Sequence, residues 1–335
     1  MLARPSYVGE DLKKRVNITR ESRPPLIEGL IHEKSIIMNS SDAGTGKSVV
    51  TACLIAQTSI GLPAFGQLFV PRPLVNYYIP FERGSQEIEE RFKHIQTSIP
   101  MDYERIHVNE RFMGLNVINE HHADEIVSNI KHDLLQRGQR VDIIWLDPIY
   151  QAVAGGLSSD DKASMFTRFS TRLQVEFDCA IWMNHHTVKD SYSSDSGQRI
   201  QKEDPFYGSQ WLKAHCSGAY YMKRLADDPG PVLLNKKDSH SCLLKKISLQ
   251  YEPDTYTVFM TGVDKTMVAK DRLLMVYRTL KKDSKSVTFR EIQGCMAGVS
   301  DSHLRELLRT PPFNTIFKKS NSSGVSTLYT PQGEI

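Results

Sequence analysis

The residues that most constrain the fold are the eight from Ser41 to Ser48, which read SDAGTGKS. The apolar run SIIMNS at 35–40 comes before them, and the small-residue, apolar sequence VVTACLIAQ follows. A glycine-rich turn between a buried strand and a helix is typical of the phosphate-binding P-loop, G-x-x-x-x-G-K-S/T. Ser41 departs from this pattern, because it stands at the position of the first glycine. The segment therefore predicts a strand, a phosphate-binding loop and a helix, in that order.

Each part of this motif has a physical task in nucleotide binding. Successive backbone N–H groups of the loop point at phosphates, and the following helix adds the positive end of its dipole. Lys47 is expected to reach the β- and γ-phosphates of ATP, and the Ser48 hydroxyl is expected to bind Mg²⁺. The first glycine of the motif helps the backbone to turn out of the strand, and serine can adopt the same backbone conformation. The predicted ligands of ATP are therefore Ser41, Asp42, Ala43, Gly44, Thr45, Gly46, Lys47 and Ser48.

Further apolar runs alternate with helical patterns along the chain. Candidate strands at 74–81, 141–149 and 179–186 are separated by segments with helical spacing, among them 85–99 and 161–177. Strands that alternate with helices favour an α/β fold with a mostly parallel, twisted sheet covered on both faces. Later apolar runs within 220–260 are expected to extend this sheet with antiparallel strands.

Polar residues at the strand ends supply candidates for hydrolysis. Asp147 ends the run VDIIWLD and is expected to bind Mg²⁺ together with Ser48, whereas Glu82 is expected to position the attacking water. His185 and His186 end the next strand. Adjacent histidines on a strand face opposite sides and chelate a metal poorly, so a γ-phosphate sensor is the preferred role, for which His185 aligns best. A packed or solvent-facing histidine pair is the alternative.

The pattern changes near Val263. Residues 264–319 hold 12 Lys/Arg and 6 Asp/Glu, a net charge of +6, so the rest of the chain carries +3 − 6 = −3. Three helical patterns followed by two short strands are what a small winged helix-turn-helix domain requires. The expected organisation is an N-terminal arm at 1–23, an α/β core at 24–262 and a winged-helix domain at 263–335. A solvated basic face is the simpler explanation of the charge.

Several classes of protein are disfavoured by composition. The sequence contains neither a run of 18 apolar residues nor an apolar secretory leader, so neither a membrane span nor secretion is expected. The five cysteines are scattered and form no C-x-x-C pair, which argues against a structural zinc site. A cytoplasmic protein with reduced thiols is the expectation.

The order of the motifs resembles the RecA/DnaB-like ATPase superfamily: P-loop, strand ending in glutamate, strand ending in aspartate, strand ending in a polar sensor. Within it, the chain is most similar to the RepA-like hexameric replicative helicases of plasmids and phages, over residues 24–260. The resemblance implies a RecA-like core with Glu82 as the catalytic glutamate and Asp147 as the Walker B aspartate. It places the sensor pattern HH-T-x-K on residues 185–189, which read HHTVK.

The resemblance also implies a homo-oligomer, a hexameric ring whose ATP sites are shared between subunits. A basic finger on a late strand reaches the neighbour's γ-phosphate, and the matching stretch VLLNKKDSH makes Lys236 or Lys237 the candidate. The family's common K-x-R pattern is not kept, because Asp238 stands at its third position. Arg224 is the alternative finger, and a solvated basic turn is the plain explanation of the two lysines.

Two segments are candidates for contact with DNA. The resemblance implies that the loop 187–207 lines the ring channel and binds single-stranded DNA, through phosphate contacts from Lys189, Arg199 and Lys202 and stacking by Tyr192, Phe206 and Tyr207. A surface loop without a ligand is the alternative. In the proposed winged helix, the residues expected to face duplex DNA are Arg305, Arg309, Lys318 and Lys319.

The preferred interpretation is an ATP-driven DNA motor, a ring-forming replicative helicase that moves along single-stranded DNA. One alternative is a RecA-like recombinase or recombination mediator that forms filaments. The other is an ATP-switched DNA-binding regulator that does not unwind DNA.

Overall fold

The computed structural model describes most of the region from Arg23 to Gly262 and part of the C-terminal region. The ranges are 23–82, 84–112, 114–157, 159–187, 191–192, 199–200, 210–225, 230–239, 243–262, 273, 277, 286–295, 300–310, 313–320 and 328–331. Almost all of the predicted N-terminal arm lies outside them. Among the described residues, no helix has the length and apolar character needed to span a membrane.

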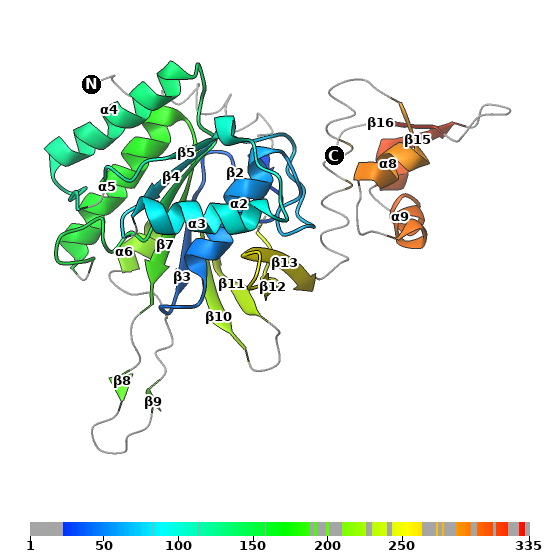
Figure 1. Ribbon diagram of the computed structural model, residues 1–335. Coiled ribbons are helices and arrows are strands. Elements are labelled where there is room, and N and C mark those ends of the chain that lie inside the picture. The colour runs from blue at the N-terminus through cyan, green and yellow to red at the C-terminus, as the bar shows by residue number, and fades with distance from the viewer. Residues whose placement is uncertain are drawn as a thin grey trace, which may run out of the picture.

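A nine-stranded sheet in the order β13-β12-β11-β10-β3-β7-β6-β4-β5 forms the centre of the fold (Figure 1). The parallel part, which confirms the predicted α/β class, consists of β3 (Ile36–Ser41), β4 (Asn76–Pro80), β5 (Ile106–Val108), β6 (Ile143–Asp147), β7 (Ala180–His186) and β10 (Gly218–Arg224). The antiparallel extension consists of β11 (Pro231–Asp238), β12 (Lys246–Glu252) and β13 (Thr257–Gly262). Because parallel strands share an orientation, the carboxyl ends of β3, β4, β6 and β7 lie at one edge.

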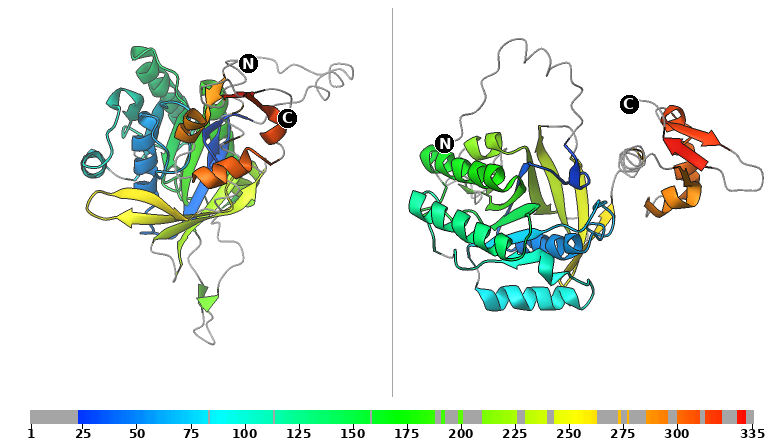
Figure 2. Two further views of the ribbon diagram at one scale, coloured as in Figure 1. Left: turned by 90° about the vertical axis from the view of Figure 1, so that its right-hand side faces the viewer. Right: turned by 90° about the horizontal axis from the view of Figure 1, so that it is seen from above.

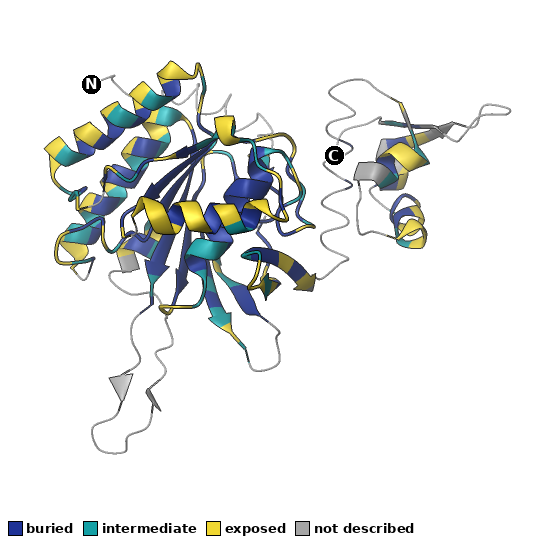
Figure 3. Ribbon diagram, in the orientation of Figure 1, coloured by how far each residue is buried: buried dark blue, intermediate teal, exposed yellow. Residues whose placement is uncertain are grey.

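Helices cover both faces of this sheet (Figure 2). One apolar cluster lies under α2 (Lys47–Ser59) and α3 (Ser85–Gln96). The second lies under α4 (Glu120–Gln136), α5 (Asp160–Phe177) and the short α6 (Gln210–His215). The central strands are buried on both sides, as Figure 3 shows, which accounts for their nearly continuous apolar sequences. Smaller elements are β1 (Pro25–Ile27), β2 (Ile31–His32) and a 3₁₀ turn at Tyr103–Arg105.

A buried polar network fixes α2 to the sheet. The Asn184 side-chain oxygen on β7 accepts hydrogen bonds from Asn39 Nδ2 and Trp182 Nε1, both at 3.1 Å, and Asn184 Nδ2 donates to Thr51 Oγ1 at 2.8 Å. All four residues are buried. Because buried polar groups are costly when unpaired, this network specifies how the helix after the P-loop sits on strands β3 and β7.

The C-terminal region has its own small core. Its elements are β14 (Val287–Thr288), α8 (Phe289–Cys295), α9 (Asp301–Leu307), α10 (Phe313–Ile316), β15 (Phe317–Ser320) and β16 (Leu328–Pro331). The strands form an antiparallel sheet in the order β14-β16-β15. Leu273 and Tyr277, in the predicted first helix, are helical and join the core. The first of the two expected strands begins at Phe317, after the short helix α10, in which Phe313 packs inward. At the start of α10, Asn314 N donates to Thr310 O. The winged-helix assignment itself stays a prediction.

Candidate nucleotide site

The P-loop joins β3 directly to α2. Gly44 and Gly46 have φ angles of +73° and +102°, and Gly46 is the residue before the helix. A Cβ atom at either glycine would meet nothing within 4 Å, so the backbone conformation, and not space, requires glycine there. Ser41 is the last residue of β3 and does not have a positive φ. A serine at the first motif position is therefore compatible with the loop.

The Lys47 ammonium is held at the mouth of this loop. Its Nζ donates to Ser41 O at 2.9 Å, to Ser41 Oγ at 2.8 Å and to Asp42 O at 3.0 Å. Burial lowers the pKa of Lys47 to about 8, against the opposing effect of three carboxylates, Asp147, Asp42 and Glu82. These carboxylates therefore lie within electrostatic reach of Lys47. The Ser41 hydroxyl supplies a contact that the usual glycine lacks, and the motif alone did not reveal it.

Asp147 ends β6 at the same edge. The strand β7 lies between β6 and β3, so the carboxylate is two strands from the P-loop strand. Its side chain is buried, and Oδ2 accepts a hydrogen bond from the Tyr78 hydroxyl at 2.9 Å. Oδ1 is also buried but has no hydrogen-bond partner among the described residues. An unpaired buried carboxylate oxygen is costly unless a donor or cation is meant for it. Asp147 thus fits a role as a Mg²⁺ ligand, directly or through water, with Ser48 at the start of α2.

Glu82 lies beside Asp147. In the β4–β6 pairing, Pro80 is opposite Asp147, and Phe81 N donates to Asp147 O at 2.8 Å. Glu82 comes one residue later and is exposed. Its carboxylate is therefore both close to Lys47 and open to water, as a residue that positions an attacking water must be.

The two histidines of β7 face different layers of the fold. Side chains alternate along a strand, so His186 shares the α2 face with Trp182 and Asn184, whereas His185 is fully buried toward the other layer. Burial, assisted by the charge of Lys47, lowers the pKa of His186 to about 4. The facing of β7 therefore favours His186 over His185 for contact with a phosphate, and the sensor role itself stays a prediction.

Thr187 connects the end of β7 to the P-loop. Its hydroxyl donates to the Asp42 carboxylate, and its backbone N–H donates to Ser41 O at 3.1 Å. The sequence pattern HHTVK contained this threonine but gave it no role. These two hydrogen bonds tie the end of the candidate sensor strand to the P-loop.

The basic-finger candidates occupy different places. Lys237 pairs with Ala219, which pairs with Met38, three residues before Ser41 on β3. Lys236 and Lys237 thus lie roughly 10 Å back along the sheet from their own P-loop. Lys237 Nζ donates to Lys213 O at 2.9 Å and to Ala214 O at 2.6 Å, near the end of α6, whereas Lys236 is exposed.

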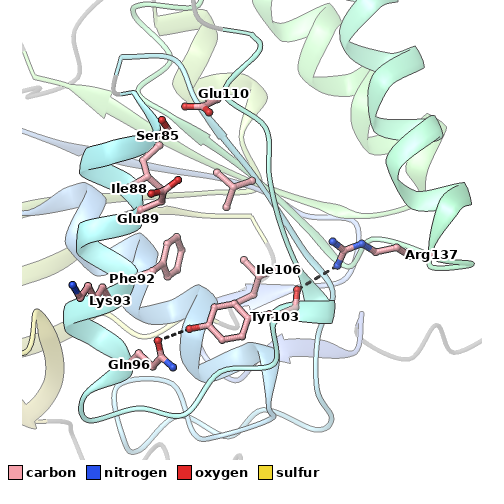
Figure 4. A pocket seen from close by; sticks show the side chains of 11 residues that line it. Ser85, Ile88, Glu89, Phe92, Lys93, Gln96, Tyr103, Ile106, Glu110 and Arg137 are labelled. Atoms are coloured by element: carbon pink, nitrogen blue, oxygen red, sulfur yellow. Dashed lines mark hydrogen bonds between the residues drawn. The ribbon is translucent and has the colours of Figure 1, made fainter.

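Arg224 lies on the nucleotide side. It comes two residues after Met222, which pairs with Ser41. With the P-loop it lines a cavity of 170 Å³ whose walls are Gly44, Thr45, Gly46, Val49, Val50, Arg224, Pro231, Tyr251 and Val258. A guanidinium, a phenol ring and apolar side chains thus surround space beside the P-loop. A larger cavity, of 470 Å³, lies between α3 and β5 and contains none of the site residues named above (Figure 4).

The DNA-contact candidates are only partly described. Lys189 and Lys202 lie outside the described residues, and Arg199 pairs with Tyr192 in the two-stranded ribbon of β8 (Ser191–Tyr192) and β9 (Arg199–Ile200). In the C-terminal region, Leu304, Leu307 and Leu308 are buried. The Arg305 guanidinium lies 4.0 Å from the centre of the Phe289 ring, while Arg309 and Lys318 are exposed. Nothing is described of the Lys319 side chain.

Comparisons with known proteins identify the family of the chain and solved structures similar to its fold. A family model described as the AAA domain matches residues 4–192, more than half of the chain, and the chain belongs to that family. Among solved structures, one described as an ATPase domain superposes with a TM-score of 0.52 at 12% identity, covering 75% of this chain and 96% of that one. The KaiC-like protein PH0186 from Pyrococcus horikoshii OT3 gives a TM-score of 0.46 at 13% identity, covering 72% and 99%. A search of curated proteins found no match.

The family match and the fold together define the class of protein. The chain has the RecA-like P-loop ATPase fold, as the order of its motifs predicted. The likeness to the solved ATPase domain, at low identity, concerns the fold alone.

Replacing Lys47 by alanine should abolish useful nucleotide binding. Two charge-assisted hydrogen bonds to phosphate contribute about 3 kcal/mol or more, so the Kd for ATP should rise about 100-fold or more. Fluorescence titration with a labelled ATP measures this change. Lys34→Ala is the matched control, since Lys34 pairs with Asp178 on the surface at 2.8 Å. Equal affinities of the Lys47→Ala variant and the unmodified chain would contradict the assignment.

Proposed function

We propose that the chain is an ATP-driven motor on DNA, a ring-forming replicative helicase that moves along single-stranded DNA. The observation that carries the proposal is the meeting of Lys47, Asp147, Glu82 and His186 at one edge of the sheet. The β8–β9 ribbon, which follows the strand of His186 in sequence, is part of the loop that the motif resemblance assigns to DNA. Nucleotide chemistry and a DNA contact thus share one strand end.

Residues 41–48 would hold the phosphates of ATP, and Ser48 and Asp147 would hold Mg²⁺. When bound, Mg²⁺ neutralises charge on the phosphate oxygens. The cavity beside Gly44 and Gly46 is the natural place for the base, because the Tyr251 ring and the Arg224 guanidinium can both stack on a flat heterocycle. With Arg224 engaged there, Lys236 is the better candidate for a finger.

Hydrolysis would use residues from three strand ends. Glu82 accepts the proton of the attacking water, and the Lys47 ammonium stabilises the charge that develops on the phosphate oxygens. Burial lowers the pKa of His186 to about 4 in the nucleotide-free chain, and its ring nitrogens can exchange hydrogen bonds with the γ-phosphate. Thr187, the first residue of the loop at 187–207, contacts Asp42 and Ser41. Through these contacts, the presence or absence of the γ-phosphate in the P-loop would affect the conformation of that loop.

A neighbouring subunit would complete the site. Lys236 is exposed and lies too far back along the sheet to reach its own P-loop, so only another chain's nucleotide is accessible to it. A head-to-tail interface of this kind generates a ring where the rotation closes and a filament where it does not. The ring, with six subunits, is the preferred arrangement because of the motif resemblance.

The alternatives differ in two observable properties. A recombinase or recombination mediator forms filaments on DNA, and an ATP-switched regulator binds DNA but does not separate its strands. Electron microscopy with ATP distinguishes rings from filaments. A forked-duplex assay with ATP and Mg²⁺ tests the motor directly, and a lack of unwinding by intact rings would reject the helicase proposal.

Replacing Glu82 by glutamine should stop turnover without preventing ATP binding. The amide cannot take a proton from water, so the hydrolysis rate should fall by about 100-fold or more while the Kd for ATP changes little. Phosphate release and fluorescence titration measure the two quantities. Glu90→Gln, at an exposed position of α3, is the control. Normal turnover in Glu82→Gln would show that another group positions the water.

The shared site predicts complementation between two inactive variants. Glu82→Gln subunits retain Lys236, and Lys236→Ala subunits retain Glu82, so equal mixtures should recover about a quarter of normal sites if the subunits assemble at random. ATPase activity of the mixture, compared with each variant alone, measures this recovery. Lys245→Ala, another exposed lysine, should behave like the unmodified chain. Full activity of a dilute monomer would rule out a shared site.

Arg309 and Lys318 should each contribute one phosphate contact to duplex binding. Their replacement by alanine should weaken binding and reduce the slope of log K against log salt by about one unit per residue. Fluorescence anisotropy on duplex DNA at several salt concentrations provides the slope. Lys93→Ala, on α3, is the control. An unchanged slope would assign the C-terminal region to contacts with protein.

A further inference from the structure

The Asp147 carboxylate is held from one side only. Its Oδ2 accepts the Tyr78 hydroxyl at 2.9 Å, and its buried Oδ1 has no hydrogen-bond partner within the described ranges. The main chain at Asp147 is fixed as well, since its carbonyl accepts Phe81 N at 2.8 Å. The hydrogen bond from Tyr78 to Oδ2 therefore fixes the orientation of the carboxylate, and with it the position of Oδ1.

The position of Tyr78 follows from strand register. Tyr78 on β4 pairs with Trp145 on β6, and Pro80 pairs with Asp147. Residues two apart face the same side of a strand, so Tyr78 and Asp147 both face α2. The two positions are about 7 Å apart along the strands, a distance that a tyrosine side chain spans. The ring is 2% exposed within the apolar cluster, so it cannot swing away from the carboxylate.

Two opposing effects follow for a cation at Asp147. A hydroxyl that donates to the carboxylate withdraws some electron density from it, which weakens cation binding. The same bond also orients the carboxylate before the cation arrives, which strengthens binding. Measured losses on removing such supporting groups are about 10- to 100-fold in metal affinity, so orientation is the larger effect. Mg²⁺ keeps several of its waters, which favours the lower end of that range.

We propose that Tyr78 is a positioning residue for the Mg²⁺ of the nucleotide site, acting through the Asp147 carboxylate. The proposal rests on the proposed function, because it presumes that Asp147 serves Mg²⁺ and nucleotide. It goes further in naming a residue on β4, to which the sequence motifs give no role, that sets how much Mg²⁺ the site requires. Tyr78 is buried and reaches the site through its hydrogen bond to Asp147, so its role is to position that carboxylate.

Tyr78→Phe tests the proposal, with Tyr220→Phe as its matched control. Both tyrosines are buried in the same apolar cluster, and the hydroxyl of each donates a buried hydrogen bond: to Asp147 Oδ2 for Tyr78, and to Gly29 O at 3.0 Å for Tyr220. Each substitution removes one buried hydroxyl and keeps the ring. A general loss of stability should therefore affect both variants, whereas an effect through Asp147 should appear in one.

The readout is binding of a fluorescent ADP during a Mg²⁺ titration, with a parallel measurement in EDTA. In Tyr78→Phe, the Mg²⁺ midpoint should rise about tenfold while affinity in EDTA stays unchanged. Tyr220→Phe should shift neither quantity. An unchanged midpoint in Tyr78→Phe would overturn the inference and leave the proposed function intact. Mg²⁺-independent nucleotide binding by the unmodified chain would instead reject the Mg²⁺ site itself.

A second comparison separates positioning from packing. If Tyr78 acts through Asp147, then Tyr78→Phe should cause no further shift of the Mg²⁺ midpoint in an Asp147→Asn background. Additive shifts would overturn the inference. If Tyr78→Phe folds poorly, 4-fluorophenylalanine at position 78 fills the volume of the hydroxyl but cannot donate. The same tenfold shift is expected there, and an unshifted midpoint counts against the inference.

Discussion

The parallel orientation of β3, β4, β6 and β7 is the constraint on which the site depends. It brings four strand ends, separated by more than a hundred residues of sequence, to one edge of the sheet. There the carboxylates of Asp147, Asp42 and Glu82 act electrostatically on the Lys47 ammonium. Burial makes this lysine easier to deprotonate and the three carboxylates oppose that effect, so the charge balance of the site depends on all four strands being in register.

The buried amide network protects that register. Asn184 lies on β7, two residues before His186. It contacts Asn39 on β3 and Thr51 on α2. A shift of β7 by one residue would turn Asn184 toward the opposite layer and leave its partners unpaired, which costs about 1–3 kcal/mol for each orphaned group. The network therefore fixes the position of the candidate sensor strand β7 relative to the P-loop helix α2. Thr187, which follows β7, makes a further contact with the P-loop, because its hydroxyl donates to the Asp42 carboxylate.

Sequence patterns predicted what is local and missed what depends on contacts between strands. The P-loop, the mostly parallel sheet and the residues at strand ends follow from short stretches of sequence, each of which carries its own signal. The bond from Tyr78 to Asp147 depends on the pairing of β4 with β6, so no local pattern contains it. Likewise, the sequence does not show which of His185 and His186 lies on the α2 side of the sheet. The hydrogen bond from Asn184 to Thr51 on α2 shows that it is His186.

The departure from the K-x-R pattern has a structural explanation. Asp238, at the third position, accepts Leu243 N at 2.7 Å with its carboxylate and so secures the chain after β11. Lys237 donates to the carbonyls of Lys213 and Ala214, where a cation complements the negative end of α6. Both residues thus serve the fold of their own chain. Lys236 lies between Asn235 and Lys237, is exposed and has no such contact among the described residues. Of the two candidate lysines, it is therefore the one that remains for the proposed contact with a neighbouring subunit.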